Sequence, residues 1–69
     1  MKRYLFGLLC PDSLGHEEFV YHEEKFACNA DAMMRARKIL DEGKRDVNAS
    51  LISVYEKVGC DWRNIVIYQ

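Results

Sequence analysis

Three cysteines and two histidines are the side chains in this sequence that could act as nucleophile and base or bind a metal. They are Cys10, Cys28, Cys60, His16 and His22. Nucleophilic catalysis requires a cysteine or serine within hydrogen-bond reach of an oriented histidine, and structural zinc sites use ligand pairs two to four residues apart. The spacing of these five residues shows neither pattern. We therefore expect the cysteines to be small buried or turn residues, and we expect no catalytic residue, no metal and no cofactor.

Two pairs of adjacent glutamates, Glu17–Glu18 and Glu23–Glu24, are the remaining candidates for general acid–base chemistry. Adjacent residues in a strand point to opposite faces, so neither pair converges on one substrate. We interpret them as solvated edge positions, where charge also deters aggregation between strands. No glycine-rich phosphate-binding pattern occurs.

Aromatic and basic side chains could act by binding instead. Tyrosine, tryptophan and arginine dominate the binding energy of protein interfaces, and sheet aromatics beside basic residues can also stack the bases of RNA. The candidate contact residues are Tyr4, Phe6, Tyr21, Tyr55, Trp62 and Tyr68, with Arg63, Arg35 and Lys38 as a polar rim. Whether they act together depends on the elements that carry them.

One helix is predicted from Asn29 to Gly43. Its apolar stripe at helical spacing consists of Ala32, Met33, Ala36, Ile39 and Leu40. We expect Asn29 to be the N-cap and Gly43 to end the helix in a left-handed conformation. The outward charged residues are expected to form i, i+4 pairs, namely Asp31–Arg35, Arg37–Asp41 and Lys38–Glu42.

Four strands are predicted around this helix, at Lys2–Leu9, Glu17–Cys28, Leu51–Val58 and Trp62–Tyr68. Turn residues from Pro11 to Gly15 separate the first two strands, and a short loop at 59–61 joins the last two. The order β-β-α-β-β predicts a single α+β domain over residues 1–69. We expect a four-stranded antiparallel sheet with the helix packed on one face.

Composition narrows the class of protein. With 49% apolar and 30% charged residues the chain is typical of globular domains, and no apolar run is long enough to cross a membrane. A net charge of −1 argues against a general nucleic-acid binder. Three cysteines that include no CxxC unit favour a reducing cytoplasm.

One helix can cover only one face of such a sheet, so the other face must meet water or a partner. The residues expected to face the helix are Leu5, Leu9, Val20, Ile52, Val54, Ile65 and Ile67. Those expected on the opposite face are Tyr4, Phe6, Leu8, Phe19, Tyr21, Tyr55, Trp62 and Tyr68. A register slip of one residue would exchange the two faces of a strand. The aromatic face predicts a covering partner.

The organisation of the chain, in which FACNADAMMRARKIL passes from strand to helix, resembles small proteins carried by phages and mobile elements, including some anti-CRISPR proteins. The resemblance implies a non-enzymatic protein that occupies a surface on a larger host partner, often as a dimer. Our leading hypothesis is a cytoplasmic protein-binding domain that acts sterically and self-associates through its uncovered sheet face or an edge strand. The alternative is a nucleic-acid-binding or regulatory module that combines the same aromatics with the basic segment Arg35–Arg45.

Overall fold

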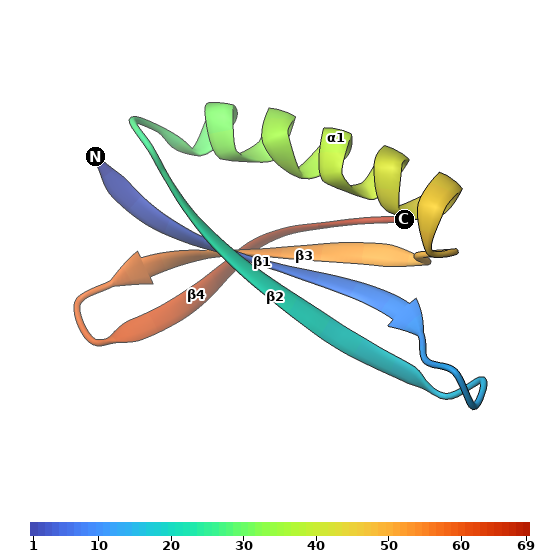
Figure 1. The fold of residues 1–69 in the computed structure, drawn as a ribbon. Helices are drawn as coiled ribbons and strands as arrows, with labels where there is room; N and C mark the ends of the chain where they lie inside the picture. Colours follow the sequence, from blue (N-terminus) through green and yellow to red (C-terminus); the bar gives the residue numbers. More distant parts are fainter.

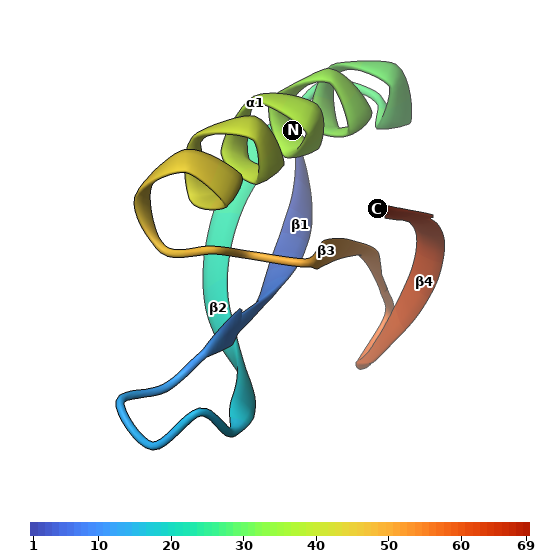
Figure 2. The ribbon, with the colours of Figure 1, turned by 90° about the vertical axis from the view of Figure 1, so that its right-hand side faces the viewer.

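The computed structural model describes residues 1–69 as one sheet and one helix. The elements are β1 (Lys2–Pro11), β2 (Glu17–Phe26), α1 (Asn29–Asp46), β3 (Leu51–Val58) and β4 (Asp61–Tyr68). All neighbouring strands are antiparallel, and their order across the sheet is β2-β1-β3-β4. Helix α1 lies on one side of the twisted sheet, and no element covers the other side (Figures 1 and 2). The predicted α+β architecture is confirmed.

The core lies between α1 and the central strands. Tyr4 and Phe6 of β1 and Ile52 and Val54 of β3 are at most 1% exposed, and they pack against the helix stripe. Directly paired residues of an antiparallel sheet share a face, and Phe6 pairs with Val54. The expected placement of Tyr4, Phe6 and Leu8 away from the helix was therefore wrong. Leu5 and Leu9 lie on the side away from the helix instead, because Phe6 and Leu8 pair with Val54 and Ile52, the buried residues of β3.

A β-bulge decides the faces of β4. Val54 pairs with Val66 and Tyr55 with Asn64, so Ile65 is an extra residue without a partner. Trp62 therefore lies away from the helix, as expected, whereas Tyr68 lies on the helix side. The placement of Tyr68 with Trp62 was wrong, and so was that of Ile67 beneath the helix, because strict alternation does not survive a bulge.

Both helix ends differ from the prediction. Cys28, and not Asn29, occupies the N-cap position, and its side chain makes no capping hydrogen bond. Asn29 is the first residue of the helix, and its side chain turns back toward the sheet. At the other end α1 continues three residues beyond Gly43, to Asp46. Gly43 is buried where α1 meets Leu8 and Ala49, and Asn48 takes the left-handed conformation, with a φ of 57°.

Two charged residues of α1, Arg35 and Arg37, contact the sheet and not the charged residues one turn away on the helix. Arg35 Nε donates to Glu24 Oε2 at 2.9 Å, and His22 Nε2 donates to the same oxygen at 2.8 Å. Arg37 lies over the ring of Tyr68, 4.3 Å from its centroid. None of the three predicted i, i+4 ion pairs forms. These contacts tie both edge strands to the helix.

Candidate functional site

The side of the sheet away from α1, which we call the open face, is largely apolar. From the strand registers its large apolar residues are Leu5, Leu9, Phe19, Tyr21, Leu51, Tyr55, Trp62 and Ile67. Phe19, Tyr21 and Ile67 are 43%, 57% and 53% exposed. A contiguous exposed apolar surface of this kind is typical of interaction sites.

Aromatic packing over a glycine shapes the middle of this face. Gly7 pairs directly with Tyr21, and the rings of Phe19 and Tyr21 stack with centroids 5.9 Å apart. A Cβ on Gly7 would lie 3.0 Å from Tyr21 Cε1 and 3.4 Å from Phe19 Cδ1. The absence of a side chain at position 7 therefore lets both rings lie low over β1 while keeping their outer faces exposed.

A shallow hollow of about 280 Å³ lies toward one end of the open face. Its four lining residues, one from each strand, are Leu5, Tyr21, Tyr55 and Trp62. All four walls are apolar or aromatic, so the hollow suits an aliphatic or aromatic side chain. We refer to it below as the hollow.

Basic side chains border the hollow. Lys57 Nζ and the Arg3 guanidinium lie 4.9 and 5.7 Å from the centroid of the Trp62 ring, within cation–π range. Lys25 pairs with Arg3 across the strands, and we call Arg3, Lys25 and Lys57 the basic row. Arg3 also donates to both carboxylate oxygens of Glu23, at 2.6 and 3.0 Å, which lowers the pKa of Glu23.

The loop between β1 and β2 lies at the opposite end of the molecule from the β3–β4 turn (Figure 1). Asp12 Oδ1 accepts hydrogen bonds from the backbone N–H groups of Leu14 and His16, at 2.8 and 2.9 Å. This folded loop leaves Leu14 78% exposed. Acidic residues accompany it, and we define the acidic tip as residues 12–18, which include Asp12, Glu17 and Glu18.

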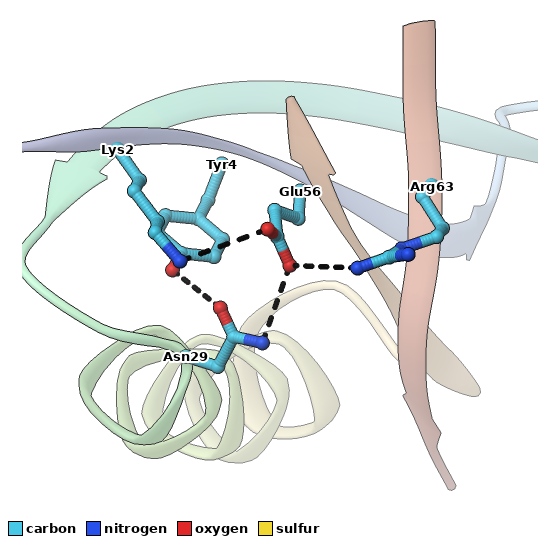
Figure 3. A network of polar contacts seen from close by, with 5 residues as sticks. All are labelled: Lys2, Tyr4, Asn29, Glu56 and Arg63. Carbon is cyan, nitrogen blue, oxygen red and sulfur yellow. Dashed lines mark hydrogen bonds and ion pairs between the residues drawn. The ribbon is translucent and has the colours of Figure 1, made fainter. Parts of the chain in front are cut away.

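A polar network fixes the start of α1 on the sheet (Figure 3). Tyr4 Oη donates to Asn29 Oδ1 at 2.6 Å, and Asn29 Nδ2 donates to Glu56 Oε2 at 3.2 Å. Lys2 and Arg63 each approach the Glu56 carboxylate at 3.8 Å. No buried side-chain nitrogen or oxygen lacks a partner, so this network is satisfied and holds the fold together.

The structure divides the predicted contact residues between the two sides of the sheet. Tyr21, Tyr55 and Trp62 meet at the hollow. Tyr4 and Phe6 are buried beneath α1, where no partner can reach them, because the register with β3 selects that face of β1. The others also belong to the helix side, namely Arg63 in the Glu56 network, Tyr68 under Arg37, Arg35 bound to Glu24, and Lys38 on α1.

Phe19 lies on the open face as predicted, but Leu5 and the basic row were not predicted as parts of this surface. A usable signal was Gly7, because a glycine inside a strand often marks close approach by another group. Leu14 was also missed, although an apolar residue in an otherwise polar turn is unusual enough to note.

Other kinds of site find less support among the side chains. All three cysteines are free, with Cys10 buried and Cys28 and Cys60 exposed. No three or more histidine, cysteine, aspartate or glutamate residues group in a way that could hold a metal ion. The helix is not long and apolar enough to cross a membrane.

Comparison of the chain with protein-family models, curated proteins and solved structures found no match.

Proposed function

We propose that this chain is a small non-enzymatic binding protein that acts by protein–protein contact through the open face. The observation that carries the proposal is the hollow formed by Leu5, Tyr21, Tyr55 and Trp62 within an exposed apolar surface. Its composition fits the aromatic and apolar centre of a protein interface, and Arg3, Lys25 and Lys57 fit the polar rim. A steric inhibitor or regulator of a larger host complex, such as phages and mobile elements carry, would act in this way in the cytoplasm.

The test is recovery of bound protein from the cell of origin by the tagged chain and by two variants. Trp62→Ala and Tyr55→Ala each remove a wall of the hollow, and we expect at least about a tenfold loss of bound partner. Met34→Gln is the matched control, because Met34 is 64% exposed on α1 and lies on the other side of the sheet. Circular dichroism establishes that each variant is folded.

Two outcomes contradict this proposal. One is that the Trp62→Ala and Tyr55→Ala variants retain the same partners and the same mass in light scattering as the wild-type chain. The other is that Met34→Gln loses binding as strongly as they do, which would place the contact on the helix.

The nucleic-acid alternative combined the sheet aromatics with the basic segment Arg35–Arg45. Tyr21, Tyr55 and Trp62 lie on the open face, whereas Arg35 and Lys38 lie on α1, across the sheet from them, so these two predicted groups form no continuous surface for one strand of nucleic acid. The basic row does border the hollow, so the salt dependence of binding separates the two functions. Binding to single-stranded oligonucleotides that weakens steeply with added salt would revive the alternative, because phosphate neutralisation has that signature.

A further inference from the structure

The two ends of the molecule carry complementary features. At one end the hollow offers an apolar recess of about 280 Å³, bordered by the basic row. At the other end the acidic tip presents Leu14, whose side chain is exposed and makes no apolar contact within the core. The Arg3 guanidinium is already paired with Glu23, which leaves the ammonium groups of Lys25 and Lys57 as the positive charges beside the recess. An exposed leucine beside the Glu17 carboxylate is the chemical complement of an apolar recess beside these ammonium groups.

We propose that the partner of the open face is a second copy of this chain, packed face to face with the long axes of the two copies antiparallel, so that Leu14 of each copy lies in the hollow of the other. This inference rests on the proposed function, because it names the partner of the same face. A two-fold axis produces both Leu14 contacts at once and closes the assembly at two chains. Glu17 of each copy then faces the basic row of its partner.

Electrostatics favours the antiparallel orientation of the two copies. A second copy turned the other way would set Lys25 and Lys57, which make no ion pair within the chain, against their own equivalents, and like charges in contact oppose association. The net charge of the chain is only −1, so two copies approach without strong overall repulsion. The attraction comes from the separation of the basic row and the acidic tip along one molecule.

The folded loop makes Leu14 a suitable anchor. The two backbone hydrogen bonds to Asp12 Oδ1, and a third between Asp12 N–H and the His16 carbonyl at 2.6 Å, define its conformation before any contact. Ordering a flexible loop on binding costs free energy, and that cost is largely absent here. Burial of a leucine side chain that is 78% exposed in the single chain favours the complex.

Sedimentation velocity over a concentration series, supported by light scattering, tests the proposal. We expect the wild-type chain to reach twice its mass of 8.1 kDa, and Leu14→Asn to raise the dissociation constant at least about tenfold. Leu14 lies in an exposed turn, so this change leaves the fold intact, which circular dichroism checks. Met34→Gln, which alters an apolar residue that is 64% exposed on α1, should dimerise like the wild type.

A charge exchange tests the direction of packing. Glu17→Lys and Lys25→Glu each place like charges together in the proposed dimer, so each should weaken it. The double variant restores opposite charges and should recover most of the lost affinity. A double variant that dimerises as weakly as the two single variants overturns the antiparallel arrangement.

The remaining outcomes separate the inference from the proposed function. If the wild-type chain keeps a mass of 8.1 kDa at every concentration, the inference is wrong. The proposed function then still stands if the wild-type chain captures a different protein and Trp62→Ala does not. A dimer that Trp62→Ala disrupts but Leu14→Asn leaves unchanged also overturns the inference while keeping the open face as the interface. A monomer that captures nothing through the hollow overturns both.

Discussion

Tyr21 lies across Gly7 on the open face, so closely that a Cβ on Gly7 would come within 3.0 Å of Tyr21 Cε1. Glycine within a strand normally costs about 0.5–1 kcal/mol relative to alanine. Here Gly7→Ala should lower the free energy of unfolding, because the added methyl group displaces the ring. In a Tyr21→Ala background the same change should raise it, which urea unfolding of the four variants measures. The same effect in both backgrounds would show that the ring does not depend on the glycine.

Gly43 should resist replacement although it lies inside a helix. Gly→Ala in an exposed helix interior typically stabilises by about 1 kcal/mol. A Cβ at Gly43 would meet Leu8 Cδ2 at 2.9 Å and Ala49 Cβ at 3.1 Å, so we expect Gly43→Ala to destabilise by about 1–3 kcal/mol, as overpacking does. Thermal and urea unfolding would measure the change, with the exposed Met34→Ala as helix control. A more stable Gly43→Ala chain would contradict the tight approach of α1 to β1.

Tyr4 links the core to the start of α1, so Tyr4→Phe should lower the free energy of unfolding at neutral pH by about 1 kcal/mol, because Asn29 loses a hydrogen-bond donor. Burial, reinforced by the negative charge of Glu56, raises the pKa of Tyr4 above the ordinary 10.0. The stability linked to Tyr4 is therefore complete below pH 10 and is lost as the pH rises from there through the folded-state pKa.

The alkaline part of that prediction is checked by urea unfolding between neutral pH and pH values above 10. Tyr4→Phe should lose less stability over this range than the wild type. Tyr55→Phe is the matched control, because Tyr55 belongs to the open face and makes no hydrogen bond in the core. Identical pH profiles for Tyr4→Phe and the wild type would count against a buried neutral phenol.

Glu24 should contribute to acid sensitivity. Burial raises the pKa of Glu24, but the hydrogen bonds from Arg35 and His22 outweigh burial and hold the pKa below its ordinary value of 4.5. A lowered folded-state pKa gives stability that is present above pH 4.5 and is lost as the pH falls through the folded-state value. We expect Glu24→Gln to flatten the decline of the urea midpoint below pH 5. Glu42→Gln is the control and should leave the decline unchanged, because Glu42 is exposed on α1 and makes no ion pair.

The element order, the helix stripe and the strand positions could be predicted because periodicity and turn residues report local structure. Which face of β1 lies under the helix could not be predicted, because Tyr4, Phe6 and Leu8 alternate with Leu5 and Leu9 and both sets are apolar. Only pairing with β3, where Val54 meets Phe6, selects the buried set. This choice needs contacts between residues far apart in the sequence.

The predicted helix ends were wrong for a related reason. Asn29 is a good N-cap by local rules, but its amide is used by Tyr4 and Glu56 from two different strands. Gly43 looks like a helix terminus, yet its missing side chain serves packing against Leu8. Of the candidate site, the trio Tyr21, Tyr55 and Trp62 was predicted, while Leu14 and the basic row required the relative positions of both ends of the sheet.

Ile65 gives β4 one residue more than strict alternation along β3 requires. Trp62 and Tyr68 occupy opposite sides of the sheet only because this residue has no partner on β3. If Ile65 paired with β3 at the present length of the strand, alternation would put both rings on the same side of the sheet. Deleting Ile65 would remove the bulge but keep Asn64 paired with Tyr55 and Val66 paired with Val54, so both rings would stay where they are.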